Sequence, residues 1–428
     1  MVETNAGAGV PRELPAGLTH GPSRERLAAG GLPASYAYLD LQASWHEPLL
    51  TAEAWYDDGI RLEGVEGLIV LGETRYDDCF GFSTADVLLD GATGEVYLAC
   101  LDESGALLRD VLASSLDTLV ALMVEVEAVT VGAAEPYEPE EGEEFEPRGP
   151  GTVAEVAGVS LERMRKADPE LFRRTDDRPA HWETALRVRA LAWGALPGEP
   201  GGLRYALDAS LVEDLAALTD GTVRRFQEED LPAALSHAPT RQLLGSLGLP
   251  VSDRGMLGID PVGPFLTMAE TYPDSFGSEN GEGENGDSED GDSEDGEGED
   301  GEGEHHRAYQ GGFLAFADWL YDMPIALDGA TGRLELPAWF DGDAPAAYLH
   351  QDVSALLYVV WTYERLRADR RPWEHPHTSV PWAVFHPREL LDWAAEGALR
   401  GLDPEAFASE DHFWPIRIED GHMGSLLE

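Results

Sequence analysis

Three histidines near residue 380 are the side chains of this chain best suited to binding a metal ion. They are His375, His377 and His386. Imidazole nitrogens are common zinc ligands, so this group could supply part of a zinc site. However, Pro376 and Pro387 favour a loop there, and no Cys-x-x-Cys pair or His-Glu-x-x-His helix accompanies the histidines. The preferred interpretation is a structural loop, and we expect no bound metal.

Two further short patterns fall short of a catalytic or cofactor-binding signature. Residues 149–151 read Gly-Pro-Gly before a predicted helix, but the glycines that follow have the wrong spacing for a dinucleotide-binding loop. Residues 81–85 read Gly-Phe-Ser-Thr-Ala and lack the second glycine of a nucleophile elbow. Because no paired catalytic signature remains, the sequence predicts a protein that is not an enzyme and that has no cofactor.

The charge of the chain indicates what kind of partner it could bind. The net charge of the 428 residues is −53. An acidic stretch from Glu279 to Glu304 holds 14 acidic residues and no basic ones, which leaves a charge of −39 elsewhere. Nucleic acid is a poor candidate ligand, because phosphate contacts need lysine and arginine. A basic protein partner fits better, since opposite fields speed encounter. A solubility requirement or a salt-adapted proteome would produce the same acidity.

The sequence also predicts a cellular compartment. Cys79 and Cys100 are its two cysteines, and they form no disulfide framework, which favours a reducing environment. The first residues lack the basic and apolar regions of a signal peptide. No stretch approaches 18 uninterrupted apolar residues. We therefore expect a cytoplasmic location and no membrane association.

The elements that must position any binding residues come from an internal repeat. Residues 19–33 read Thr-His-Gly-Pro-Ser-Arg-Glu-Arg-Leu-Ala-Ala-Gly-Gly-Leu-Pro, and seven of them recur unchanged 217 residues later. Leu-Asp-Gly-Ala-Thr-Gly at residues 89–94 returns at 327–332, and Asp-Pro-Glu at 168–170 returns at 403–405. These matches predict two tandem copies of one domain. The seven repeated residues are His20, Pro22, Arg24, Leu27, Gly31, Leu32 and Pro33, which match His237, Pro239, Arg241, Leu244, Gly248, Leu249 and Pro250.

The repeated arginines and histidines have both a functional and a structural interpretation. Arg24 and Arg241 could bind a ligand, but each could equally tie its helix to a nearby carboxylate or carbonyl. The structural role is the preferred one. His20 and His237 are predicted to be turn or cap residues for the same reason.

Both copies are predicted to have an α+β fold, in which helices flank an antiparallel sheet. We place a flexible tail at residues 1–16, the first domain at 17–200 and the second at 201–428. A disordered acidic insertion is expected at 277–306, because Gly, Ser, Asp and Glu offer no apolar surface to bury. In the first copy we expect a short helix at Arg24 to Ala29, a buried strand at Leu68 to Leu71, a hairpin at Val87 to Ala99, a helix capped by Ser115, and helices between Thr152 and Leu196. In the second we expect helices at Ala209 to Leu218, Val353 to Leu366 and Arg388 to Leu399, strands at Gly221 to Phe226 and Phe313 to Phe316, and a hairpin at Pro324 to Pro337.

The motifs together resemble the SUKH superfamily, in its fourth immunity subfamily. The matching pattern is an acidic lead ending in Leu-Pro (residues 229–232), Pro-[Ser/Thr]-Arg-x-x-Leu, Gly-Leu-Pro, a buried strand, and a Leu-Asp-x-x-Thr-Gly hairpin. Paired serines at 114–115 start the next helix in the first copy, whereas the second copy departs with Asp-Val-Ser at 352–354. The resemblance implies an α+β fold and a cytoplasmic immunity protein. Such a protein binds and blocks a toxin domain, a nuclease or a nucleic-acid deaminase, without catalysis.

The loop after the buried strand is the predicted partner-binding surface of each copy. Aromatic and acidic side chains mix there, as expected of a surface that docks onto a basic protein. Ordinary loop composition would account for them equally well. A scaffold or regulatory protein that binds an endogenous partner is the alternative function. The predicted surface consists of Glu73, Tyr76, Asp77 and Asp78 in the first copy and Asp318, Trp319, Tyr321 and Asp322 in the second.

Overall fold

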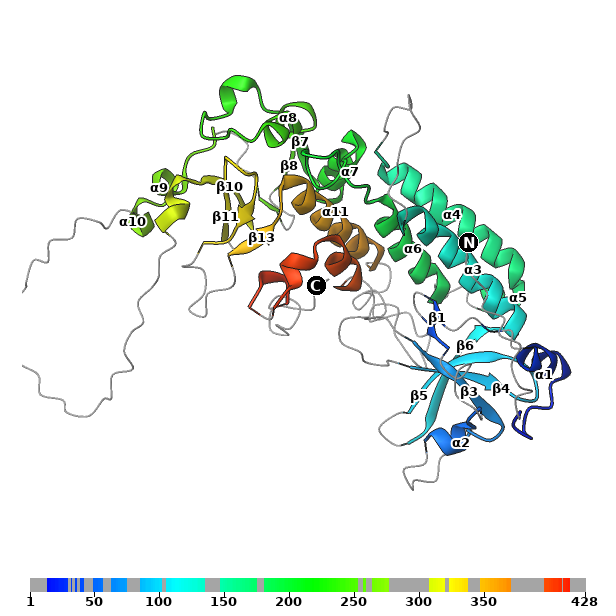
Figure 1. Cartoon of the computed structure of the whole chain (residues 1–428). Helices are drawn as coiled ribbons and strands as arrows, with labels where there is room; N and C mark the ends of the chain where they lie inside the picture. The colour runs from blue at the N-terminus through cyan, green and yellow to red at the C-terminus, as the bar shows by residue number, and fades with distance from the viewer. Residues whose placement is uncertain are drawn as a thin grey trace, which may run out of the picture. The chain divides into compact units, whose positions relative to one another are not determined.

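The chain divides into two compact units, each described here by itself (Figure 1). The first contains Met1–Leu196, Arg365–Leu402 and Gly424–Glu428, and the second contains Pro197–Glu364 and Asp403–Met423. The boundaries given above for the two copies, 17–200 and 201–428, remain a prediction. The computed structural model describes residues 14–29, 32, 35–36, 39–41, 49–56, 63–74, 85–101, 105–134, 147–174, 181–252, 257–258, 264–276, 308–319, 323–337, 347–370, 396–409 and 411–415. Predictions for the acidic insertion and for the three histidines near residue 380 fall outside these residues.

The first unit is built on an antiparallel sheet whose strands follow the order of the chain. Each described strand pairs with the next, and a bulge interrupts the pairing of the third and fourth between Val70 and Gly72. The predicted hairpin is confirmed, and Gly94 closes it with a φ of +82°. The strands are β1 (Ser35–Tyr36), β2 (Leu39–Asp40), β3 (Leu68–Thr74), β4 (Asp86–Asp90), β5 (Val96–Leu101) and β6 (Leu107–Ala113).

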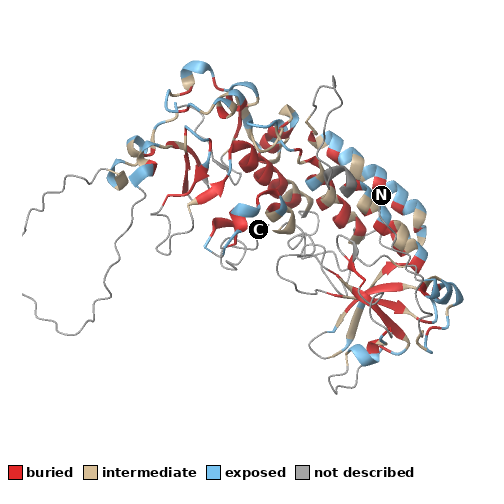
Figure 2. Ribbon diagram, in the orientation of Figure 1, coloured by how far each residue is buried: buried red, intermediate tan, exposed pale blue. Residues whose placement is uncertain are grey.

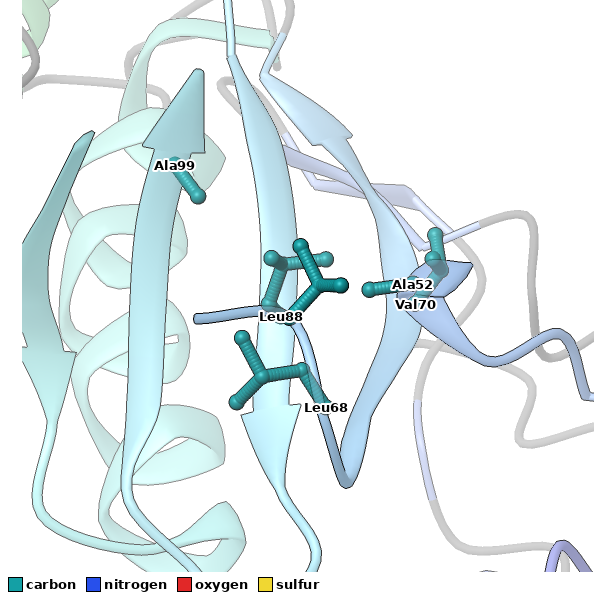
Figure 3. Close-up of a cluster of buried hydrophobic side chains, with 6 residues drawn as sticks. Ala52, Leu68, Val70, Leu88 and Ala99 are labelled. Carbon is teal, nitrogen blue, oxygen red and sulfur yellow. The ribbon is translucent and has the colours of Figure 1, made fainter. Parts of the chain in front are cut away.

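Both faces of this sheet are covered. Val87, Leu88 and Leu89 are consecutive in β4, and all three are fully buried, although neighbouring side chains of a strand point to opposite faces. The short helix α2 (Ala52–Trp55) covers one face, where Ala52 joins an apolar cluster with Val70 and other strand residues (Figure 3). Burial of this kind contributes about 25 cal/mol per Å² of apolar surface.

Helices complete the first unit. The helix α1 (Gly21–Ala28) has Pro22 in its first turn and begins three residues before the predicted start at Arg24. Ser115 caps α3 (Leu116–Ala134), because its Oγ accepts a hydrogen bond of 3.2 Å from the backbone nitrogen of Thr118. Contacts join α3 to α4 (Pro150–Ala167) and to α6 (His181–Gly194), and α5 (Pro169–Arg174) lies between those two in the chain. Within the described residues, no helix is long and apolar enough to cross a membrane.

The second unit contains a sheet with the strand order β13-β12-β11-β10-β9 and a separate pair, β7-β8. Its central strands are buried, and its long helix is buried along most of its length (Figure 2). Trp361 on that helix donates a hydrogen bond of 2.7 Å to Asp214. The strands are β7 (Thr222–Arg224), β8 (Leu249–Val251), β9 (Leu257–Gly258), β10 (Leu314–Trp319), β11 (Met323–Leu327), β12 (Leu334–Glu335) and β13 (Tyr348–His350). The helices are α7 (Ala209–Leu218), η2 (Glu228–Asp230), α8 (Ala238–Ser246), α9 (Met268–Thr271), α10 (Pro273–Phe276), η3 (Ala308–Gly312), α11 (Val353–Arg370) and η6 (Pro404–Phe407).

The repeated motif makes the same hydrogen bonds in both units. The backbone nitrogen of His20 donates to the carbonyl of Gly91 at 2.7 Å, and that of His237 donates to Gly329 at 2.8 Å. Each motif therefore fastens the start of a helix, α1 or α8, to the turn of its hairpin. The histidine rings also correspond, because His20 Nδ1 lies 2.7 Å from Ser23 Oγ and His237 Nδ1 lies 2.8 Å from Thr240 Oγ1.

The repeated arginines have the predicted structural role. Nη1 of Arg24 donates to the carbonyl of Leu18 at 2.7 Å, and Nη1 of Arg241 donates to the carbonyl of Leu235 at 2.8 Å. Charge-assisted hydrogen bonds of this kind hold the segment before each helix in place. Both arginines thus belong to the frame of the repeat.

The closing glycine of each hairpin gives the first testable prediction. Gly94 has a φ of +82°, and an added Cβ would collide with the ring of His20. Gly94→Ala should therefore lower the free energy of unfolding by about 2 kcal/mol or more, since a side chain at positive φ alone costs roughly 1–2 kcal/mol. Gly332→Ala should do the same through His237. Urea denaturation followed by circular dichroism measures both.

Gly64→Ala is the matched control for this prediction. Gly64 has a φ of +85°, but nothing lies within 4 Å of an added Cβ. Gly64→Ala should therefore lower the free energy of unfolding only by the cost of a side chain at positive φ, which is roughly 1–2 kcal/mol. Equal losses in Gly64→Ala and Gly94→Ala would show that the histidine does not constrain the turn.

Candidate partner-binding surface

Glu73 and Asp318 occupy equivalent places in the two copies. Glu73 in β3 pairs with Asp86 of β4, and Asp318 in β10 pairs with Pro324 of β11. A bulge precedes each acid, between Val70 and Gly72 in β3 and between residues 315 and 317 in β10. The hairpin after each acid is offset by 238 residues between the two copies, which is the offset of the repeated Leu-Asp-Gly-Ala-Thr-Gly motif. The structure therefore places one predicted acid per copy at the same position of the sheet.

The rest of the predicted surface is described only in part. The backbone of Trp319 pairs with Met323 of β11, so this residue ends β10. Asp318 is exposed and Glu73 is half-buried. Tyr76, Asp77, Asp78, Tyr321 and Asp322 lie outside the described residues.

A contact between aromatic side chains and Asp86 lies next to Glu73. Trp55 donates its indole hydrogen to Asp86 at 3.1 Å, and the hydroxyl of Tyr56 donates to the other oxygen of the same carboxylate. Both donors come from the end of α2, which lies on the sheet face that contains Asp86. The sequence analysis missed this contact, because Trp55 and Asp86 are 31 residues apart.

The second copy has a related contact. Tyr272 follows α9 as Tyr56 follows α2, and its hydroxyl lies 3.5 Å from Asp318. A threonine caps each of these helices, Thr51 in one and Thr267 in the other, and each threonine bridges to the strand of its bulge. Comparing the copies at this offset of 216 residues would have revealed the shared tyrosine from the sequence.

Burial changes the pKa values of Tyr56 and Asp86, the two groups that share a hydrogen bond in the first copy. Burial, helped by the hydrogen bond to Asp86 and by its charge, raises the pKa of Tyr56 well above its usual value. Burial also raises the pKa of Asp86, and the hydrogen bonds from Tyr56 and Trp55 oppose that rise. Tyr56 therefore remains a hydrogen-bond donor at any physiological pH.

Carboxylates form a row across three neighbouring strands of the first copy. Asp40 of β2 pairs with Glu73, and Glu73 pairs with Asp86. Like charges directly opposite each other in a sheet are destabilising, so this row costs stability. Among the described residues, no group of three or more His, Cys, Asp and Glu side chains is arranged to hold a metal ion. The row is thus a concentration of negative charge next to exposed aromatic and apolar side chains.

The apolar side chains beside this row are exposed in both copies. Leu50 precedes Thr51 and is 39% exposed, and Leu266 precedes Thr267 and is 46% exposed. The carbonyls of both leucines accept hydrogen bonds from the bulged strands, at 3.0 Å from Val70 and at 2.9 Å from Ala315. Each copy thus presents a leucine, a tyrosine and acids around a short helix.

Comparison with known families shows which family the chain belongs to. The family model of the SUKH-4 immunity protein matches residues 6–188 and 207–420. The chain belongs to this family. Two matched ranges confirm the two tandem SUKH-4 copies predicted from the repeat. No curated protein and no solved structure matches the chain.

Membership of the SUKH-4 family agrees with the observed fold. Both units combine helices with antiparallel sheets, so the predicted α+β class is confirmed. The family consists of immunity proteins, whose function is to neutralise a toxin protein and which are generally not catalytic. The surfaces around α2 and α9 are therefore candidates for contact with a protein partner.

Proposed function

We propose that the chain is a cytoplasmic immunity protein that binds a polymorphic toxin domain and blocks it. The observation that carries this proposal is the match of the SUKH-4 immunity protein family to both copies. We further propose that the toxin is a nuclease or a nucleic-acid deaminase and that the chain acts by binding alone. Glu73, Asp318 and the neighbouring acids and aromatics of the two predicted loops form the docking surface in this proposal.

Electrostatics support a basic partner. The chain carries a net charge of −53. A toxin that acts on nucleic acid binds phosphates and therefore has a positively charged groove. An acidic protein surface with aromatic anchors complements such a groove in charge and in contact area. Nucleic acid itself would be repelled by the same surface.

Growth of bacteria tests the proposal. A toxin domain found to be encoded beside the gene of this chain should arrest growth when expressed alone, and co-expression of the chain should restore growth. A chain with an early stop codon is the control for expression load. If the chain gives no protection against that toxin, the immunity proposal fails, and a scaffold that binds an endogenous partner becomes the better account.

The acidic insertion gives a second prediction. A chain that lacks residues 277–306 should melt within a few degrees of the intact chain, because the insertion between Glu279 and Glu304 has no apolar residue to bury. Differential scanning calorimetry measures this. The deletion also removes 14 negative charges, so association with a basic toxin should become slower. A large loss of melting temperature would show instead that the insertion packs onto the domain.

A further inference from the structure

Trp55 is an exposed tryptophan held in a fixed orientation. Trp55 is 46% exposed, and its indole nitrogen donates a hydrogen bond of 3.1 Å to a carboxylate oxygen of Asp86. Asp86 is in turn held by the hydroxyl of Tyr56. Because the one polar hydrogen of the indole is already used, the exposed part of Trp55 can recognise a partner only through its apolar ring face.

The surroundings of this ring are acidic. The carboxylate of Asp86 contacts the indole itself, and Glu73, which is half-buried, pairs with Asp86 across β3 and β4. No lysine or arginine occurs among the described residues 49–56 and 63–74. Among the described residues of this sheet face, the basic side chain is that of Arg109. Asp86 of β4 pairs with Ala99 of β5, and Ala99 pairs with Arg109 of β6. The carboxylates that the structure places beside Trp55, Asp86 and Glu73, favour a cation at the exposed ring.

The same sheet face already holds a guanidinium in the expected way. The guanidinium carbon of Arg109 lies 4.9 Å from the ring centroid of Tyr97. The hydroxyl of Tyr97 donates to Glu95 at 2.6 Å, so here too an aromatic ring is fixed by a carboxylate and covered by a cation. Cations bind tryptophan rings more strongly than tyrosine rings.

We propose that Trp55, with Asp86 and Glu73, forms a receptor for an arginine or lysine side chain of a basic protein partner. The cation lies over the exposed indole ring, Asp86 keeps the ring in position, and the surrounding carboxylates stabilise the charge. This inference rests on the proposed function in one respect, namely that the basic protein is the toxin. It assigns the main anchor to the first copy, beside the end of β3 where Glu73 pairs with Asp86.

The second copy lacks this receptor, which makes it an internal control. The residue equivalent to Trp55 is Thr271, and the residue equivalent to Asp86 is Pro324. Its exposed aromatic residue is Tyr309, which is 56% exposed and donates its hydroxyl to Glu335 at 2.7 Å. Tyr309 matches Trp55 in exposure and in its bond to a carboxylate, but it lies on η3, which contacts α9, and not on the equivalent of α2 itself.

A peptide titration tests the receptor without the toxin. The probe is a short peptide with two arginines, and its control is the same peptide with citrulline, which keeps the shape of arginine but has no charge. The chain has 11 tryptophans, and the indole nitrogen-15 signal that disappears in Trp55→Leu belongs to Trp55. At low salt that signal should shift with the arginine peptide, and the signals of the buried Trp182 and Trp414 should not. No shift, or an equal shift with citrulline, would overturn the proposal.

Binding of the toxin domain tests the assignment to the first copy. Trp55→Leu should raise the dissociation constant about 30-fold, as expected when a central aromatic anchor is lost, whereas Tyr309→Leu should raise it less than about 3-fold. Trp55→Phe keeps a ring face and should fall between the intact chain and Trp55→Leu. Thermal melting should fall only slightly and by similar amounts in Trp55→Leu and Tyr309→Leu, since each change removes one hydrogen bond to a carboxylate from a largely exposed side chain. Equal effects of Trp55→Leu and Tyr309→Leu would overturn the assignment. A toxin that the intact chain does not bind would refute the proposed function, and the peptide titration would still decide on the receptor.

Discussion

Asp403→Ala should destabilise the second unit by about 3–5 kcal/mol, which is the cost expected when one partner of a buried charged network is removed. Asp403 is fully buried. It lies 2.8 Å from Nδ1 of His350, accepts from the hydroxyl of Tyr348 at 3.2 Å, and lies 3.6 Å from Arg204. The ring of His350 is fixed at its other end, where Trp414 donates to Nε2 at 3.3 Å. Urea denaturation of the intact chain measures the loss.

Two other variants make this result specific. Glu405→Ala removes an exposed acid two residues away and should change the free energy of unfolding by less than about 0.5 kcal/mol. Asp168→Ala should destabilise the first unit, because Asp168 is the repeat equivalent of Asp403 and accepts from Ser114 at 2.7 and 2.8 Å. An Asp403→Ala protein as stable as the Glu405→Ala protein would show that the buried network contributes nothing.

The same carboxylate gives a direction for the pH dependence. Burial alone would raise the pKa of Asp403, but the hydrogen bond from His350, the charge of Arg204 and the hydrogen bond from Tyr348 hold that pKa below its ordinary value. A carboxylate whose pKa is lowered by folding stabilises the fold above its unfolded pKa, and this contribution is lost as the pH falls through the folded pKa. The stability difference between the intact chain and Asp403→Ala should therefore shrink in acid.

Charge reversal should have the largest effect on binding. Changing Asp77 and Asp78 to lysine, or Asp318 and Asp322, should slow association with the toxin by an order of magnitude or more in whichever copy docks it. The physical reason is that long-range attraction between an acidic chain and a basic toxin raises the encounter rate. The same change in the other copy should be tolerated, so each pair of substitutions is the control for the other. Stopped-flow fluorescence measures both rates.

Salt should reproduce the effect in the intact chain. The Debye length falls from about 30 Å at 0.01 M salt to about 10 Å at 0.1 M, so association should slow steeply over this range. Dissociation should change less, because buried contacts rather than long-range fields set it. Association that does not depend on salt, or equal indifference of both copies to charge reversal, would leave the acidity of the chain without a role in binding.

The repeat made much of the fold predictable from the sequence. The motif at His20 and His237 predicted the helix starts, and the Leu-Asp-Gly-Ala-Thr-Gly motif predicted both hairpins, because tight turns and caps demand particular residues. The sequence analysis did not predict the strands β6 and β13. Backbone pairing with β5 and β12 holds these two strands in the sheet, and no local sequence pattern reveals such pairing. The pairing of β7 with β8 was missed for the same reason.

The candidate surface was predictable only in part. Glu73 and Asp318 were predicted to lie in the loop after a buried strand, which is wrong, because the pairing continues and places them within β3 and β10, at one position of the sheet. The contact of Trp55 and Tyr56 with Asp86 joins a short helix to a strand, and it depends on how the helix lies over the sheet. Contacts of this kind follow from tertiary packing, so spacing along the chain does not predict them.

The measurement that tests the central claim most directly is a titration of toxin activity with the purified chain. A fixed amount of the toxin domain acts on its nucleic-acid substrate while the chain is added in steps. If the chain neutralises the toxin by binding, activity should fall in proportion to the chain added and should vanish once the toxin is saturated. Activity that is unaffected by an excess of the chain would contradict the account, as would inactivation of all the toxin by a trace of the chain, which would indicate catalysis.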